Sequence, residues 1–416
     1  NIAVALLSST DTTDLTGTNL YLDNFSNNAK GWGFADNGSD GIASGVMTIA
    51  NNASARATDS NALTGVAAGT KLSVSYTVTF GGAGTLTLDD DGSGAGAGGV
   101  TSIIQSTASG SETQKVSTIY TKTASDRFRF IRTGGGNFTI DDLVVRILPE
   151  QDRSVNNNGL AVYGTITKDV VAPGADLVYY GGFSNSNYLL QPYNSQLDFG
   201  TGDLYIMFWV RFSQNDAYDL LMARRAHDGS SYTGNGWYIE MGNDQNIQIK
   251  DSVGGTRAQI DADSNSLAWQ HICFVRRDNI SYSYKNGILQ SNTYTWNENL
   301  DNSSAFLTIG RSTISGGGDA DKSRLSLVRI GADAPTEEQI KKIYYDEKGL
   351  YTDNAKCTLY GTSDEIKALA YDDSNTILHA GTSSGRSEFQ GLNRINNTTT
   401  AVTTAISASN GFVAEQ

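Results

Sequence analysis

The fold is decided by residues 269–287, WQHICFVRRDNISYSYKNG. Every second residue from Trp269 to Val275 lies on one side of a strand, and we expect that side to face the core. Asn286 and Gly287 form the residue pair most typical of a type I′ turn between antiparallel strands. The stretch therefore predicts antiparallel strands with one buried face.

Further strands surround this stretch. Short runs of alternating apolar and polar residues recur at regular intervals, separated by Gly, Asn, Asp and Ser. This rhythm predicts one antiparallel sandwich over residues 175–352. The runs are 204–212, 237–242, 246–252, 269–277, 280–287, 305–311 and 324–331.

One helix is predicted, over residues 336–345. The sequence PTEEQIKKIYYDEKG has Pro and Thr at its start, acidic residues in its first turn and Gly349 beyond its end. Ile340 and Tyr344 belong to its apolar stripe, and we expect the helix to dock on the sandwich through them. We expect residues 175–350 to fold as one unit on their own.

Residues 1–148 show the same period-two runs, interrupted by Gly-rich clusters such as 89–100. They predict another antiparallel sandwich. Residues 149–174 read as a connector with one short strand, and residues 353–416 as a small β-rich module that opens a propeller or a repeat. The expected fold class is all-β: two antiparallel jelly-roll β-sandwiches in tandem, plus a small β-rich C-terminal segment.

The composition excludes several classes of protein. The chain has 416 residues, with 45 Gly against 4 Pro, which suits many short strands joined by tight turns. Its net charge of −14 repels phosphate backbones and anionic bilayers, so we expect no nucleic-acid partner and no membrane insertion. Only two cysteines occur, Cys273 and Cys357, so no disulfide framework is expected.

The first residues, NIAVALLSSTD, lack the basic flank and long apolar core of a signal peptide, and no initiator Met is present. No apolar run reaches the length of a membrane-spanning helix. We expect the chain to be a piece of a longer protein.

Residues 175–350 resemble the laminin-G-like, concanavalin-A-like lectin domains. The resemblance rests on four strings in order: NYLLQPYNSQLDFGTGDLYIMFWVRF, WQHICFVRRDNISYSYKNG, FLTIGRS and RLSLVRIGADAPTEEQIKKIYYDEKGLY. It implies a jelly-roll sandwich and calcium in loops at one end, which draws attention to Asp319 and Asp321 in GGGDADKS (316–323). Most acidic clusters of this kind, such as DDDGSG (89–94), are solvated turns.

Residues 19–148 resemble jelly-roll carbohydrate-binding modules through DNFSNNAKGW, ASGVMTIA, KLSVSYTVTF and FTIDDLVVRI. This resemblance implies a structural calcium held by Asp141 with Asp23 or Asn24. No other cofactor is expected.

Taken together, DRSVNNNGLAVYGTITKDVVAPGADL, the lectin-like unit and SDEIKALAYDDSNTILHAGTSSGR resemble marine bacteriophage virion proteins of the tail-fibre or appendage kind. This resemblance implies a homotrimer that faces the host, contacts with other virion proteins and a location on the virion surface, outside the cell.

Sugar binding commonly uses an aromatic ring fringed by polar side chains. Trp32 and Tyr294 lie in polar, loop-like surroundings that suit this role. For Trp237 and Trp296, a core position and a ligand contact are both open. Trp209 and Trp269 lie on alternating strands and are expected in the core.

Catalytic patterns are missing from the sequence. A glycoside hydrolase of this sandwich class needs two carboxylates on one sheet face, and Glu240 has no paired strand Glu. Glu240 is therefore expected to be a solvated strand residue. The three histidines, His227, His271 and His379, belong to no nucleophile arrangement and are expected to be structural.

The sequence therefore favours a non-enzymatic virion appendage protein that binds host-surface or environmental glycans. A purely structural filament, capsid or tail subunit is one alternative. An accessory binding region of a secreted polysaccharide-degrading enzyme is another.

Overall fold

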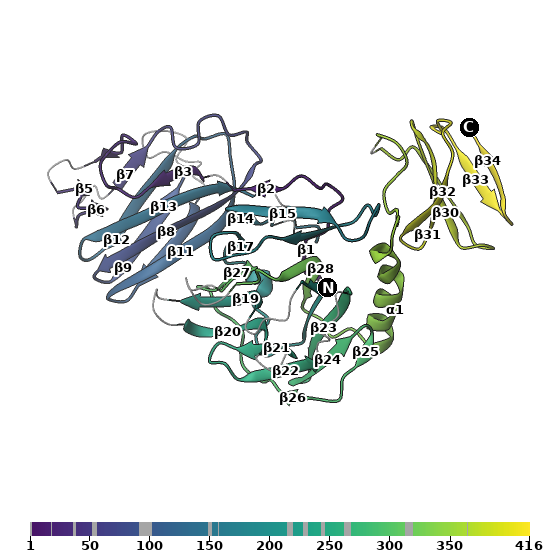
Figure 1. Ribbon diagram of the computed structural model, residues 1–416. Coiled ribbons are helices and arrows are strands. Elements are labelled where there is room, and N and C mark those ends of the chain that lie inside the picture. Colours follow the sequence, from purple (N-terminus) through teal and green to yellow (C-terminus); the bar gives the residue numbers. More distant parts are fainter. Residues whose placement is uncertain are drawn as a thin grey trace.

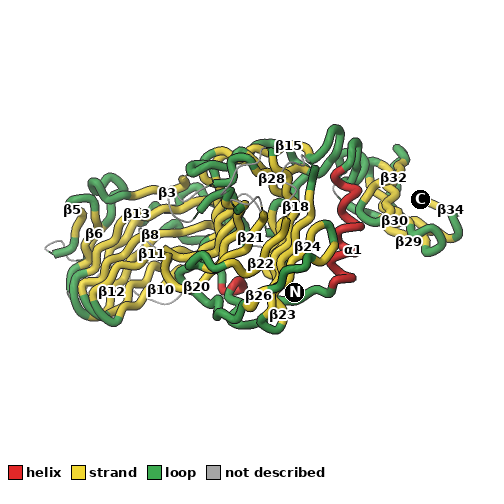
Figure 2. Tube along the Cα trace, turned by 60° about the horizontal axis from the view of Figure 1, so that its bottom comes forward, coloured by secondary structure: helices red, strands yellow, loops and turns green. Residues whose placement is uncertain are grey.

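A computed structural model of the protein describes residues 2–17, 19–35, 39–51, 56–90, 102–148, 152–156, 158–213, 219–227, 232–242, 246–261, 268–312, 319–363 and 365–416. Strands dominate these residues, with one α-helix among them, α1 (Glu337–Glu347), and short 3-10 turns η1 (Ser195–Leu197) and η2 (Lys348–Tyr351). The all-β prediction is confirmed. Two sandwiches and a C-terminal β unit follow one another in a row (Figure 2).

The first sandwich has two antiparallel sheets around one apolar core (Figure 1). In β8, every second residue from Leu72 to Phe80 is buried, as the alternation predicts. Tyr76 of β8 packs edge-on against Phe130 of the opposite sheet, with ring centroids 5.1 Å apart. One sheet has the order β11 (Ser111–Thr121), β8 (Lys71–Gly81), β13 (Phe138–Ile147), β6 (Val46–Ile49), β5 (Gly41–Ala43), with β3 (Asn19–Asp23) on β13. The other has the order β10 (Ser102–Ala108), β9 (Gly84–Asp89), β12 (Phe128–Gly134), β7 (Arg56–Asp59), β4 (Gly33–Phe34).

The second sandwich pairs a larger and a smaller antiparallel sheet around a separate core. Its larger sheet has the order β2 (Leu15–Thr16), β15 (Thr165–Val170), β16 (Val178–Gly181), β28 (Ser323–Gly331), β18 (Leu204–Phe212), β23 (Gln270–Arg277), β24 (Ile280–Lys285), β25 (Ile288–Leu289). In addition, β1 (Ile2–Leu6) pairs with β28 and β26 (Tyr294–Thr295) with β24. Its smaller sheet has the order β14 (Ala161–Tyr163), β17 (Tyr188–Gln191), β27 (Phe306–Ile309), β19 (Leu220–His227), β20 (Tyr232–Met241), β21 (Asn246–Asp251), β22 (Thr256–Asp261).

The first sandwich is inserted into the second. The chain starts in the second sandwich, where β1 lies along β28 with Val4 opposite Ile330, and β2 lies along β15. It then forms β3 to β13 and returns through β14 and β15. The entry and exit of the insertion are neighbours, because Asn19 pairs with Arg146.

This arrangement corrects three sequence-based boundaries. Residues 2–16 belong to the second sandwich and not to a 1–148 unit, since Val4 and Leu6 are buried in its core. The 149–174 segment is not a mere connector, because β14 and β15 are strands of the two sheets. Residues 175–350 lack four strands of the sandwich to which they belong, because sequence neighbours give no sign of partners so far along the chain.

The helix α1 lies on the outer surface of the larger sheet (Figure 1). Thr336 and Gln339 cap its start reciprocally. As predicted, Ile340 and Tyr344 hold the helix against the sheet. Ile340 packs with Met207 and Cys273. Tyr344 packs against the neighbouring cluster that contains Trp209.

The helix also changes the interpretation of β23. Ile272 and Phe274 are its residues in the sandwich interior, whereas His271 and Cys273 face outward and are buried toward α1 and the residues that follow it. The expectation that the Trp269–Val275 side faces the sandwich core is therefore wrong: the side is buried under the helix instead. The predicted turn is confirmed, with positive φ at Asn286 (52°) and Gly287 (75°).

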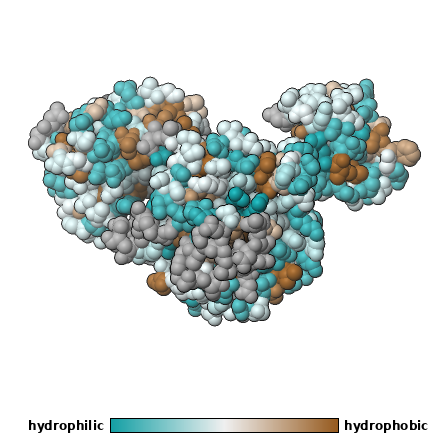
Figure 3. Space-filling view, in the orientation of Figure 1, coloured by the Kyte–Doolittle hydropathy of each residue, from teal (hydrophilic) through white to brown (hydrophobic). Residues whose placement is uncertain are grey.

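The C-terminal unit is a meander of β29 (Ala368–Asp372), β30 (Ile377–Thr382), β31 (Gly385–Gln390) and β32 (Asn393–Asn397), with a hairpin of β33 (Ile406–Ser409) and β34 (Phe412–Glu415). Four strands is the number in a propeller blade, and that assignment stays a prediction. Apolar patches are visible on this unit (Figure 3). Its exposed large apolar side chains are Ile366, Leu369, Tyr371, Leu378, Leu392, Ile395 and Phe412.

Within the described ranges, no helix is long and apolar enough to cross a membrane. Cys273 is buried and Cys357 half-buried, and both are free thiols.

Candidate functional site

The tryptophans expected to bind sugar lie inside the two cores. Trp32 donates its indole N–H to Asp23 Oδ2 at 2.9 Å and stacks on Phe130, and only 3% of its surface is exposed. Trp237 and Trp296 are fully buried in the second sandwich. A ring with almost no exposed surface cannot stack on a sugar, so the predicted sugar contact is wrong for Trp32. For Trp237 and Trp296, which were open between the two roles, the structure shows the core position. Their polar sequence neighbours gave no sign of this burial.

Tyr294 is half-buried in β26 and remains a predicted sugar contact. Trp209 is buried, as expected, and donates its indole N–H to Glu347 Oε2 at 2.7 Å. Trp269 differs from its expected core position, because it lies half-buried at the surface beside Tyr179.

The residues proposed to bind calcium have other partners. Asp23 is buried, and its two oxygens accept hydrogen bonds from the Phe25 backbone N–H and the Trp32 indole. Asn24 Oδ1 accepts a hydrogen bond from the Ser26 backbone N–H, and Asp141 Oδ1 accepts one from the Asp142 backbone N–H. The calcium implied by the resemblance at these residues stays a prediction.

The loop predicted at 316–323 is described only from Asp319 onward, and that at 89–94 only up to Asp90. Asp319 Oδ2 accepts from the Asn185 backbone N–H at 2.9 Å, and Asp321 forms an ion pair with Lys322. Across the described ranges, no group of three or more His, Cys, Asp or Glu side chains is placed to hold a metal ion.

Glu240 is not the solvated residue that its sequence context suggests. It is 8% exposed and forms an ion pair with Lys250, with Oε1 and Nζ 2.7 Å apart. Its cross-strand neighbours are Leu220 and Gln248, so neither provides a second carboxylate.

Burial lowers the pKa of His271 to about 3 and also lowers that of His379, so both imidazoles are neutral near pH 7. This fits a structural role for the two residues. The side chain of His227 lies outside the described residues.

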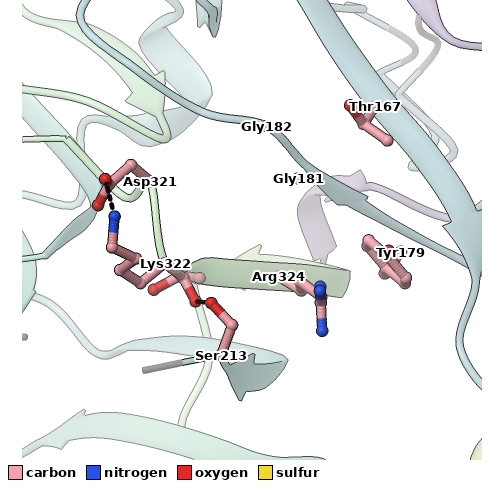
Figure 4. Close-up of a pocket in the computed structure, with 9 residues that line it drawn as sticks. Thr167, Tyr179, Gly181, Gly182, Ser213, Asp321, Lys322 and Arg324 are labelled. Carbon is pink, nitrogen blue, oxygen red and sulfur yellow. Dashed lines mark hydrogen bonds and ion pairs between the residues drawn. The ribbon is translucent and has the colours of Figure 1, made fainter. Parts of the chain in front are cut away.

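The open part of the larger sheet contains a polar pocket. Where α1 and η2 pack, the outer surface of this sheet is covered by an aromatic cluster of Trp209, Tyr344 and Tyr351. Beyond that cluster, β15, β16 and the first part of β28 leave a cavity of about 170 Å³ (Figure 4). This is smaller than the roughly 300–1,000 Å³ of drug-sized sites, so it suits one small polar ring or group.

Alternation along the strands places the side chains of this pocket. Thr167 lies opposite Gly181 across β15 and β16, and Tyr179 is on the same outer side. Inward-facing Tyr180 pairs with Leu325, which directs Arg324 outward. Figure 4 shows Tyr179 and Arg324 at one end of the pocket. The remaining lining residues include Ser213, Asp321 and Lys322 at the other end.

The pocket offers groups of several kinds. The Arg324 guanidinium carbon lies 5.1 Å from the centroid of the Tyr179 ring, a cation–π distance. Ser213 Oγ donates to the Lys322 carbonyl at 3.0 Å, and the Lys322 ammonium is paired with Asp321. An aromatic ring beside hydroxyl, carboxylate and guanidinium groups can hold a polar ligand by contact and by hydrogen bonds.

Sequence reasoning missed this pocket. The alternation of side chains along the strands DLVYYGG and KSRLSLVRI places Tyr179 and Arg324 on the side opposite to their core neighbours. It gives no sign that β15 joins the sheet, or that α1 leaves this half of the sheet open.

No curated protein sequence matches the chain. Among solved structures, the binding domain of Paraclostridial Mosquitocidal Protein 1 aligns with 18% identity and a TM-score of 0.37, over 57% of this chain and 62% of that one. The botulinum neurotoxin serotype D binding domain aligns with 15% identity and a TM-score of 0.37, over 58% of this chain and 60% of that one. The chain thus spans about three fifths of the length of these structures.

A family model matches a large part of the second sandwich. It is the model of the Concanavalin A-like lectin/glucanases superfamily, and it covers residues 183–341. These residues include the first part of α1 and the pocket side chains from Ser213 to Arg324. Residues 183–341 therefore match the concanavalin A-like lectin domains that the sequence resemblance predicts.

Proposed function

We propose that this protein binds saccharides without cleaving them, through the pocket around Tyr179. The observation that carries the proposal is the pocket itself: an aromatic ring, two hydroxyl side chains and an arginine converge on the open surface of a lectin-like domain. A shallow site of this size holds one sugar residue, so single-site binding is expected to be weak.

The first experiment measures binding of the full chain to a panel of polysaccharides by affinity electrophoresis, together with release of reducing ends. Tyr179→Ala is expected to weaken retention, because it removes the ring against which a sugar would lie. Tyr371→Ala, at an exposed tyrosine of the C-terminal unit, is the matched control. Loss of binding in both variants, or release of reducing ends by the unmodified chain, would contradict the proposal.

The proposal includes no required cofactor. A chelator is therefore expected to leave retention unchanged. A loss of retention that added calcium restores would instead support the calcium expected from the sequence.

The proposed setting is a virion appendage outside the cell, in a homotrimer. This part rests on the resemblance of the connector and C-terminal strings to phage virion proteins, and on the arrangement of three β units in a row (Figure 2). Several weak sites on one particle raise the overall affinity by about 10² or more. Purified particles should then bind host cells that the monomeric chain does not retain.

One observation favours the structural-subunit alternative. The exposed apolar side chains of the C-terminal unit suit subunit contacts better than contact with solvent. Light scattering of the chain with Leu369→Lys and Leu378→Lys tests this alternative. If these changes abolish an oligomer and no glycan binds the unmodified assembly, the purely structural role replaces the proposed one.

A further inference from the structure

Two arginines lie side by side on the open surface of the larger sheet. Arg211 of β18 is directly opposite Arg324 of β28 in the strand register. Both side chains are half-buried. Like charges opposite each other on adjacent strands destabilise a sheet unless something compensates them.

Among the described residues, no acidic side chain forms an ion pair with either arginine. No ion pair or hydrogen bond joins either guanidinium to another residue in the part of the chain that the structure describes, and Arg211 Nε is buried without a partner. Asp321, at the far end of the pocket, is paired with Lys322. Asp169 lies opposite Tyr179 one strand further out, and its Oδ1 accepts the Val170 backbone N–H at 2.8 Å.

One of the two arginines, Arg324, packs against an aromatic ring. Arg324 packs over Tyr179, and the Tyr179 ring centroid lies 6.0 Å from that of Trp269. Stacking holds a guanidinium by its face and leaves the N–H groups along its edge available. The pair therefore presents unused donors and two positive charges beside an apolar wall.

We infer that Arg211 and Arg324 together bind the anionic group, carboxylate or sulfate, of an acidic saccharide whose ring lies against Tyr179. Guanidinium groups bind such oxyanions bidentately. The chain carries a net charge of −14, so long-range attraction does not bring acidic polymers to it and the selectivity must be local. This inference rests on the proposed function and names its ligand class.

The structure offers a competing role for the same residues, because Arg324 covers an aromatic ring and the arginines could act only in packing. The two roles predict opposite effects on stability. If the pair is a binding device, replacing one arginine relieves like-charge repulsion and leaves the melting temperature unchanged or higher. If the pair serves only packing, the melting temperature falls.

The test uses the full chain and two matched ligand pairs. Polygalacturonate is compared with fully methyl-esterified pectin, and dextran sulfate with dextran, so that each pair differs in charge on the same backbone. The variants are Arg211→Gln, Arg324→Gln and Arg324→Lys, and the control is Arg56→Gln at an exposed arginine of the first sandwich. Dissociation constants are measured at low and at physiological salt.

The unmodified chain should bind at least one acidic polymer more tightly than its neutral partner, and less tightly as salt rises. Each Gln variant should weaken acidic binding by about tenfold or more, the cost of losing charge-assisted hydrogen bonds. Arg324→Lys should keep part of the affinity for acidic polymers that Arg324→Gln loses. Arg56→Gln should leave that affinity unchanged.

The remaining outcomes count against the inference. Equal binding of charged and neutral polymers, unaffected by the Gln variants, would overturn the acidic preference and leave the proposed function in place. Binding of no saccharide would overturn both. A lower melting temperature of the Gln variants with unchanged binding would assign the arginines to packing alone.

Discussion

Trp237 and Trp296 show how a residue with polar neighbours becomes a core residue. Each is fully buried, and the Trp296 ring lies 5.2 Å below the guanidinium of Arg276, which donates to the carbonyls of Gly200, Gly202 and Glu298. Alanine at either tryptophan leaves a large cavity in the second sandwich. Trp269 is half-buried, so its removal leaves a smaller one.

We expect Trp237→Ala and Trp296→Ala to lower the free energy of unfolding by about 3–5 kcal/mol each, and Trp269→Ala by less. Urea denaturation of the second sandwich, followed by tryptophan fluorescence, measures these changes. The sequence alone predicts the reverse order, with Trp269 as the core residue. A larger loss for Trp269→Ala would restore that order and contradict the burial described above.

His271 gives the second sandwich a pH dependence. Burial lowers its pKa from 6.5 to about 3, so below pH 6.5 the unfolded chain takes up a proton that the folded chain does not. Stability must therefore fall as the pH drops from about 6.5 toward 3, with a slope of up to about 1.4 kcal/mol per pH unit from this residue.

The measurement compares urea unfolding at pH 7.5 and pH 4.5 for the unmodified chain and for His271→Leu. The variant lacks the titrating group and should lose about 2–3 kcal/mol less stability between the two pH values. His379 titrates in both proteins and cancels in the comparison. Equal losses in both would mean that His271 is protonated in the folded state.

Only part of the candidate site could be predicted at the residue scale. Alternation marks Tyr179 and Arg324 as outward-facing, because their neighbours Tyr180 and Leu325 are core residues. Which outward-facing residues stay open depends on where α1 packs, and sequence periodicity does not contain that information. The same gap explains why alternation left Trp237 and Trp296 open between a core position and a ligand contact.

At the scale of elements, β1 is the strand whose place most affects the fold. Val4 is buried in the second sandwich and Ile2 on the same strand is exposed. Val4→Asp should therefore destabilise the second sandwich by several kcal/mol, since it buries an unpaired charge among apolar side chains. Ile2→Asp should have little effect.

Hydrogen exchange followed by mass spectrometry locates the damage. For Val4→Asp, protection should fall in β18 and β28 and persist in β8 of the first sandwich. If protection falls in β8 instead, the N-terminal strand belongs to the first sandwich, as its position in the sequence suggests.

Local signals predicted elements well and their partners poorly. The Asn286-Gly287 turn and the capped helix α1 follow from neighbouring residues, which fix the backbone angles and the capping hydrogen bonds. The pairing of β1 with β28 joins residues more than three hundred positions apart, and no local pattern encodes it. The all-β class was therefore predictable, and the domain boundaries were not.

At the scale of the whole molecule, the insertion divides the chain into a discontinuous host sandwich and a continuous guest. The guest, residues 19–148, has its own apolar core, and its ends meet where β3 pairs with β13. Compact units whose ends lie together tolerate insertion and excision. The host depends on residues from both sides of the guest, since β1, β2, β14 and β15 all contribute to its sheets.

Excision tests this architecture. We expect a chain in which a short Gly/Ser linker replaces residues 19–148 to remain β-rich and to unfold cooperatively, because every strand of the host is retained. Residues 175–352 alone should aggregate, because the loss of β1 and β15 exposes the edges of β28 and β16. Circular dichroism and size-exclusion chromatography distinguish the two. A monomeric, cooperatively folded 175–352 fragment would show that the host does not need the strands on the far side of the guest. An unfolded excised chain would show that the guest is required to bring these strands together.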